Sequence, residues 1–156
     1  MLNVRPYVTI LSACVSLASA SNVSAQAGTP KKVFACPLGK KMVSVSAVGN
    51  RLTYQFGTPA KVEMTIIASA AQGNVFFRMD RYASMEYQLR FTNGPYSYIV
   101  YSMGANQRAG SDDVSGLVVM KGKQQIANMN CIRFSELNLP FDYDQLPEDS
   151  EEYTAM

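Results

Sequence analysis

The chain has 156 residues, with 14 Lys and Arg against 12 Asp and Glu and with neither histidine nor tryptophan. This length fits one small domain, and the lack of histidine excludes the usual general base and the most common metal ligand. The cations are scattered singly or in pairs, which argues against a nucleic-acid surface.

The N-terminal residues have the parts of a secretion signal. Arg5 is the only charged residue among the first 30, an apolar or small stretch covers residues 7–20, and Ala25-Gln26-Ala27 fits an A-x-A cleavage site. We therefore predict a signal peptide over residues 1–27. The apolar run is shorter than the about 20 residues of a membrane span, so no transmembrane segment is expected.

Two alternatives at this end of the chain remain open. Ala18-Ser19-Ala20 is a second possible cleavage site. Leu11-Ser12-Ala13-Cys14 resembles the lipobox of a bacterial lipoprotein, in which the cysteine is acylated. Cleavage after Ala27 is favoured because the apolar stretch continues past Cys14.

Beyond this segment, short strands alternate with turn residues. In 51–56, Leu52, Tyr54 and Phe56 share one face and polar side chains occupy the other. Comparable patterns predict strands in chain order at 31–36, 41–48, 51–56, 61–67, 75–79, 86–92, 96–102, 116–120 and 124–131. Most connections are hairpin turns of the Gly49-Asn50 kind, so the domain, residues 28–141, is predicted to be an antiparallel meander of about eight strands.

The remaining segments lack this alternation. Residues 103–115 are rich in Gly, Asn, Ser and Asp and are predicted to form an exposed loop. The apolar residues of 137–141 are expected to pack across one end of the domain. Residues 142–156 hold six of the twelve acids and no Lys or Arg, which favours a solvated, partly disordered acidic tail. The alternative is a tail that folds back over the basic body.

Cys36 and Cys131 are the two cysteines outside the predicted signal peptide. A lone pair in an exported chain is most simply a disulfide. The bond would bring the first and last strands together, because bonded cysteines have Cα atoms within about 7 Å. The expected fold is therefore all-β, closed as a small barrel or sandwich by one disulfide.

No arrangement of residues predicts catalysis. Without histidine, and with both cysteines bonded, the common nucleophile–base pairs are missing. No S-x-x-K sequence is present, and Asp112-Asp113 lie side by side in a predicted loop, where acids are usually solvated. We expect no enzyme activity, no cofactor and no metal site.

Binding residues are better supported. Tyrosines gather in one third of the chain, and exposed tyrosines favour interfaces because each offers a large apolar area with a polar tip. Tyr98 and Tyr101 point to opposite faces of one strand. Nearby loop and turn cations add charge to this region. The candidate binding residues from this region are Tyr96, Tyr98, Tyr101, Arg108 and Lys121.

Three segments resemble a known family, the periplasmic and lipoprotein inhibitors of c-type lysozyme. Phe34-Ala35-Cys36-Pro37-Leu38-Gly39-Lys40 is similar to the family's aromatic–x–Cys–x–x–Gly start. Val118-Val119-Met120-Lys121-Gly122 resembles its apolar run ending in Lys-Gly, and Ser115-Gly116 its Ser-Gly loop. The resemblance implies a small disulfide-closed barrel in which Ser115 and Lys121 would enter a lysozyme cleft.

These observations predict a periplasmic or secreted binding protein that blocks a lysozyme or another cell-wall hydrolase. The alternative is a non-enzymatic envelope protein that binds glycan, lipid or an assembly partner. In both cases we expect a partner other than nucleic acid.

Overall fold

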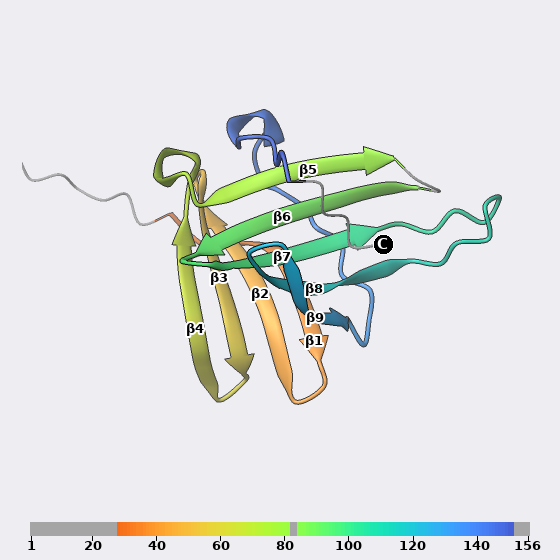
Figure 1. Ribbon diagram of the computed structural model, residues 1–156, viewed down its shortest axis with the longest axis horizontal. Coiled ribbons are helices and arrows are strands. Elements are labelled where there is room, and N and C mark those ends of the chain that lie inside the picture. The colour runs from red at the N-terminus through yellow and green to blue at the C-terminus, as the bar shows by residue number, and fades with distance from the viewer. Residues whose placement is uncertain (1–27, 82–83, 152–156) are drawn as a thin grey trace, which may run out of the picture.

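The computed structural model describes residues 28–81 and 84–151, and these contain nine strands and two 3-10 turns but no α-helix (Figure 1). The predicted signal peptide and the Cys14 alternative lie outside the described residues. The strands are β1 (Lys31–Leu38), β2 (Lys41–Val48), β3 (Arg51–Thr58), β4 (Lys61–Ala68), β5 (Val75–Arg81), β6 (Met85–Asn93), β7 (Tyr96–Met103), β8 (Val114–Lys121) and β9 (Gln124–Asn130). The turns are η1 (Ala70–Gln72) and η2 (Tyr143–Gln145).

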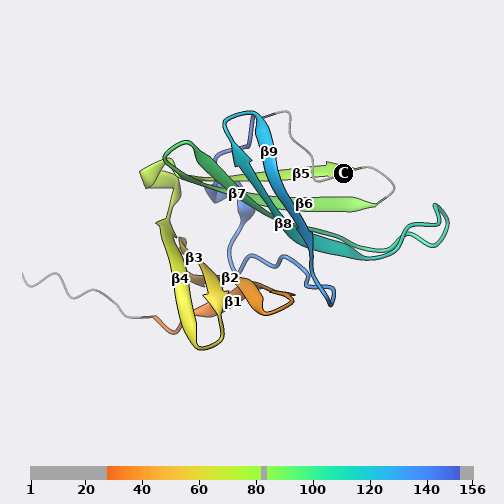
Figure 2. The same cartoon turned by 60° about the horizontal axis from the view of Figure 1, so that its bottom comes forward.

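The strands form two antiparallel sheets. One has the order β1-β2-β3-β4 and the other β5-β6-β7-β8-β9, so within each sheet every strand pairs with its neighbours in the chain. The strands of one sheet run across those of the other (Figures 1 and 2). The all-β prediction is confirmed, whereas the described strands remain two sheets and do not close into one barrel.

Tight hairpins explain why consecutive strands pair. Gly49, Gly94 and Gly122 have φ values of 59°, 58° and 55°, the left-handed region that two-residue hairpin turns require. These glycines stand between β2 and β3, β6 and β7, and β8 and β9. The strand ends at these three turns agree with the sequence prediction to within one residue.

The connection between β4 and β5 changes sheet. The Ser69 backbone N–H donates to the Asn74 side-chain oxygen at 3.2 Å, and the Asn74 amide group donates to the Ile67 carbonyl at 3.0 Å. These two bonds fold η1 into a compact corner between the sheets. Because of this corner, β4 and β5 do not pair with each other.

The core lies between the inner faces of the two sheets. Tyr54 of β3 is fully buried, and its ring centroid lies 5.4 Å from that of Phe91 and 5.5 Å from that of Tyr98. Burial raises the pKa of the Tyr54 hydroxyl above its usual value. Aromatic contacts of this kind join the four-stranded sheet to the five-stranded sheet.

The predicted disulfide is present and joins the two sheets. Cys36 of β1 and Cys131, just after β9, are bonded with a Cα–Cα distance of 5.2 Å. Their strands belong to different sheets, so the expected proximity of first and last strand is achieved without strand pairing. The Ile132 N–H donates to the Pro37 carbonyl at 2.9 Å beside the bond.

After the disulfide, the C-terminal segment (residues 131–151) runs along one edge of each sheet. The Asn138 N–H donates to the Val33 carbonyl of β1 at 3.0 Å. Leu137 is buried, and Leu139 and Phe141 pack against the core, as the sequence predicts. Farther on, Phe77 of β5 donates its N–H to Pro147.

The favoured prediction of a solvated tail is wrong for residues 142–151. Phe77 and Glu148 form a parallel bridge, and the Asp149 N–H donates to the Phe77 carbonyl at 2.8 Å. Leu146 and Asp149 are buried, and the Tyr143 ring stacks on Phe77 with centroids 5.1 Å apart. The described part of the tail therefore folds back on the body along β5.

Candidate binding groove

The five-stranded sheet has two apolar faces. Its inner face, which includes Val100 and Leu117, belongs to the main core. Its opposite or outer face carries a second buried cluster of Ile99, Tyr101, Val118 and Met120. One partner sheet can cover only one face of such a sheet, so the apolar residues of the outer face need cover from other parts of the molecule.

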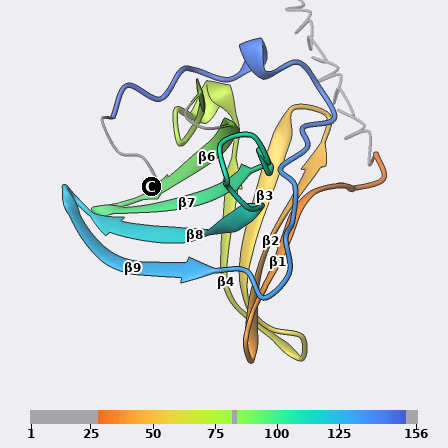
Figure 3. The ribbon, with the colours of Figure 1, turned by 90° about the vertical axis from the view of Figure 1, so that its right-hand side faces the viewer.

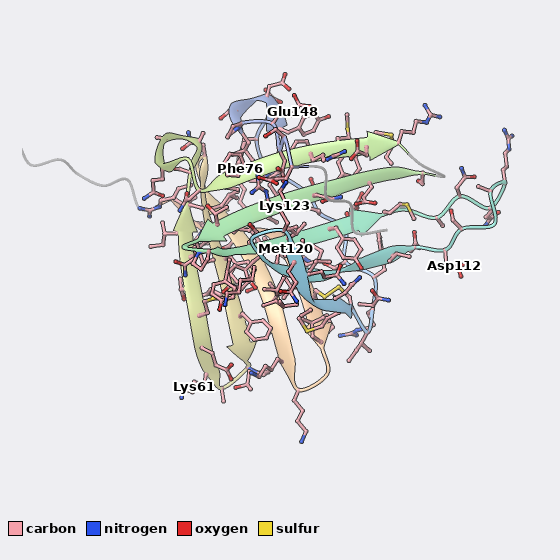
Figure 4. All side chains as sticks on the ribbon, in the orientation of Figure 1. Lys61, Phe76, Asp112, Met120, Lys123 and Glu148 are labelled. Carbon is pink, nitrogen blue, oxygen red and sulfur yellow. A yellow bond between two sulfur atoms is a disulfide. The ribbon has the colours of Figure 1, made fainter. Side chains whose placement is uncertain are left out.

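A groove of about 830 Å³ lies on this outer face. It runs between the β6–β7 turn, the β8–β9 turn and the end of the C-terminal segment, and Figure 4 labels Met120 and Lys123 within it. The lining residues are Arg90, Thr92, Gly94, Pro95, Ser97, Ile99, Met120, Gly122, Lys123, Ser150 and Glu151. A volume of this size falls in the range of roughly 300–1,000 Å³ that is usual for ligand sites.

The floor and rim of the groove differ in chemistry. Ile99 of β7 and Met120 of β8 form an apolar floor and are 1% and 8% exposed. Thr92 and Ser97 add hydroxyl groups at the β6–β7 end. Lys123, an exposed turn residue, places an ammonium group at the rim, and no salt bridge to it is found among the described residues.

The second cation of the groove, Arg90, is already paired. Its Nε and Nη2 donate to the two carboxylate oxygens of Asp149 at 2.7 and 2.6 Å, with side-chain exposures of 11% and 5%. The guanidinium also lies 4.5 Å from the centroid of the Phe76 ring. This two-bonded pair fixes the tail, whose Ser150 and Glu151 form one wall of the groove.

Neighbouring charges on β5 hold the same stretch of tail. The Arg78 Nη1 donates to the Glu151 carbonyl at 2.6 Å, and its Nε donates to Asp80. The C-terminal segment bridges to Phe77 of β5, and Figure 3 shows it on the side of the five-stranded sheet opposite to β9. The wall of the groove is thus tied to two arginines of adjacent strands.

Two candidate residues from the sequence are buried. Ser115 is 4% exposed, and its hydroxyl accepts the N–H of Ser135 at 2.9 Å. Tyr101 is 2% exposed and donates its hydroxyl to the Asn130 side-chain oxygen at 2.9 Å. Burial, and then the charge of Glu86, raise the pKa of Tyr101. Both side chains hold the C-terminal half together and do not face a partner in this conformation.

Of the other candidates, Tyr96, Tyr98 and Lys121 are neighbours, whereas Arg108 lies apart from them. Lys121 is exposed, with its Nζ 5.8 Å from the centroid of the half-buried Tyr96 ring. Tyr98 is also half-buried but packs against the core. Arg108 is exposed in the β7–β8 loop, which extends away from the β8–β9 turn, as Asp112 in Figure 4 illustrates.

The structure therefore brings Tyr96, Tyr98 and Lys121 together but does not unite all the sequence candidates in one site. Ser115 and Lys121 are six residues apart on β8, which separates them by about 20 Å along an extended strand. The groove residues Arg90, Ile99 and Met120 were not singled out from the sequence. The available signal was that 99–101 and 117–120 are apolar at successive positions, which indicates a strand buried on both faces.

The described residues contain no group of three His, Cys, Asp or Glu side chains that could hold a metal ion. Within the same described ranges, no helix is long and apolar enough to cross a membrane. Comparisons with protein-family models, with curated proteins and with solved structures give no match, so the candidate site rests on the geometry of this chain.

Proposed function

We propose that this protein is a non-enzymatic binding protein of an extracytoplasmic compartment, and that its groove holds an anionic amphiphile such as a fatty-acid carboxylate. The observation that carries the proposal is the position of a buried apolar floor next to an exposed ammonium. The disulfide fits the oxidising compartments in which such bonds persist. A periplasmic or secreted location is part of the proposal.

The chemistry of the groove supports this ligand class over a glycan. An acyl chain would lie over Ile99 and Met120 and gain mainly from removal of its own apolar surface from water, because these two side chains are already buried. Its headgroup would face Lys123, while Arg90 stays neutralised by Asp149. The described lining residues include no aromatic ring on which a sugar would stack.

Isothermal titration with dodecanoate below its micelle concentration tests the proposal. We expect binding to the oxidised protein, weaker binding of dodecyl maltoside, and an about tenfold loss of dodecanoate affinity in Lys123→Glu, because reversing a charge beside the headgroup is worth about 1.4 kcal/mol. Lys61→Glu is the matched control, since Lys61 also stands at a hairpin end but on the other sheet (Figure 4).

Two results would overturn the proposal. One is the absence of heat with both dodecanoate and dodecyl maltoside. The other is an equal loss of dodecanoate affinity in the two lysine variants, which would indicate non-specific attraction by a basic surface. If a neutral oligosaccharide binds and neither amphiphile does, the result would favour the alternative that the groove binds a glycan.

Inhibition of a lysozyme is a second candidate function, favoured by the exposed Lys121 lying close to Tyr96. If this candidate holds, the protein inhibits c-type lysozyme, Lys121→Ala abolishes inhibition, and Lys40→Ala, on an exposed turn of the other sheet, does not. The assay is turnover of cell walls at two salt concentrations. If neither salt concentration shows inhibition, lysozyme inhibition is excluded as a function, and the proposal for the groove is unaffected.

A further inference from the structure

The four outer edges of the two sheets differ in what covers or protects them. The β1 edge is covered by the C-terminal segment, where Ile132 and Asn138 donate to β1 carbonyls. The β5 edge is covered by residues 147–149 through two backbone hydrogen bonds with Phe77. The β4 edge carries charges of both signs on Lys61 and Glu63. At Asn128 and Asn130 the β9 edge has no such backbone cover among the described residues, and the strand has no charged residue.

β9 has the composition of a strand that accepts another strand. Its sequence, QQIANMN, has no charged residue and no proline, and five of its seven residues are exposed. Ile126 leaves 49% of its surface exposed. Natural proteins usually protect an open edge with a charge, a proline or a covering segment, because unpaired backbone groups pair readily with another chain.

The hydrogen-bond pattern shows which backbone groups are available. Cys131 donates its N–H to the Ser115 carbonyl at 2.8 Å, so position 131 bonds inward to β8. Bonding alternates along an antiparallel strand, and the register Leu117–Met129 and Val119–Ala127 continues the inward series. The N–H and C=O groups of Asn128 and Asn130 therefore point away from the sheet. A register shift opposite Val119 and Met120 ends this regular stretch near Ile126.

The charges at the two ends of β9 identify the kind of partner. Lys121 and Lys123 stand before the strand and Arg133 after it, and all three are exposed. Antiparallel pairing of β9 with a second copy would place the lysines of one chain beside the arginine of the other, which like charges oppose. A strand with acidic residues at both ends would be attracted instead.

We propose that the β9 edge binds an extended, acid-flanked segment of a partner protein by strand addition. Main-chain bonds to Asn128 and Asn130 would supply affinity, and an apolar side chain of the partner would cover Ile126. The terminal acids would face Lys123 and Arg133. Lys123 would take part in both sites, whereas Ile126, Asn128 and Asn130 are not part of the groove lining. Substitutions at Ile126 and Asn128 therefore test strand binding separately from dodecanoate binding.

The test uses the peptide DDTVTVTVDD, a lysine-flanked version KKTVTVTVKK and a strand-breaking version DDTVPVPVDD. Hydrogen exchange of the full oxidised protein is measured by NMR with and without each peptide. We expect the acidic peptide to slow exchange of the Asn128 and Asn130 amides at least tenfold, and the other two peptides to leave it unchanged.

Matched variants locate the binding edge. Ile126→Asp is expected to weaken binding of the acidic peptide at least tenfold in fluorescence anisotropy, because it removes the apolar contact and repels the peptide's acids. Ile67→Asp, at a similarly exposed isoleucine on the β4 edge, leaves binding unchanged. Asn128→Pro removes one outward N–H without removing an inward bond and should also abolish binding.

Three outcomes would overturn the proposal. The first is no protection of the β9 amides by the acidic peptide. The second is equal binding to the two isoleucine variants or protection confined to β4. The third is protection of β9 that grows with protein concentration in the absence of peptide, which would assign the edge to a second copy of this chain.

Discussion

Replacing both Cys36 and Cys131 with alanine is expected to lower the free energy of unfolding by about 4 kcal/mol. The bond closes a loop with a sequence separation of 95 residues, and in the chain-entropy model a loop of that size restricts the unfolded chain strongly. Cys36 is also fully buried, so its truncation removes core contacts. Urea unfolding of the oxidised wild type and of the double variant measures the difference.

The control for the disulfide is the reductant itself. Dithiothreitol should destabilise the wild type by a similar amount and leave the double alanine variant unchanged. Alkylation of the unreduced protein should label neither Cys36 nor Cys131. Equal stability of the reduced and oxidised wild type would mean that packing and the C-terminal segment are sufficient to hold the two sheets together.

Asp149→Asn is expected to destabilise the protein by about 3 kcal/mol. The substitution leaves the Arg90 guanidinium buried without its carboxylate, and an unpaired buried charge is far less favourable than a pair. Glu148→Gln is the matched control, because Glu148 is the exposed neighbour on the same segment. A surface substitution of that kind should change stability by no more than about 0.5 kcal/mol.

The Arg90–Asp149 pair can be distinguished from a general effect of tail charge. The double variant Arg90→Met with Asp149→Leu should be more stable than Asp149→Asn, since no buried charge then lacks a partner. Limited proteolysis within residues 142–151 should accelerate in Asp149→Asn and not in Glu148→Gln. Equal unfolding midpoints for the two single variants would show that Asp149 contributes no more than its exposed neighbour.

Local patterns in the sequence account for the strands and hairpins. The alternation of Leu52, Tyr54 and Phe56 correctly identifies an inward face, and the turn glycines locate the hairpins. The disulfide follows from counting cysteines. These features depend on residues near one another in the chain, or on a pair with no competitor, and a single sequence contains that information.

The division into two sheets could not be obtained in this way. Alternation tells which side chains share a face but not which strands share a sheet. The segment from Ser69 to Asn74 has the composition of a loose loop, whereas its side-chain hydrogen bonds make it a fixed corner. That corner separates β4 from β5 and prevents a single continuous meander.

The candidate site was harder to predict for a related reason. Ser115 and Tyr101 are residue types common at surfaces, yet their covering partners, Ser135 and Asn130, are 20 and 29 residues away in the chain. Asp149 was interpreted as one of several solvated acids because Arg90 is 59 residues distant. Long-range pairs of polar residues leave no periodic signal in one sequence.

The course of the C-terminal segment has a consequence for the order of folding. All strand pairings within the two sheets join neighbours in the chain, so each meander can form from local contacts. The bonds made by residues 131–149 link them instead to β1, β5 and β6, far back in the chain. The disulfide and the edge contacts between the sheets must therefore wait until residues 131–149 have been synthesised. Until then, the two meanders are joined only by the β4–β5 corner and by core packing such as that of Tyr54 against Phe91 and Tyr98.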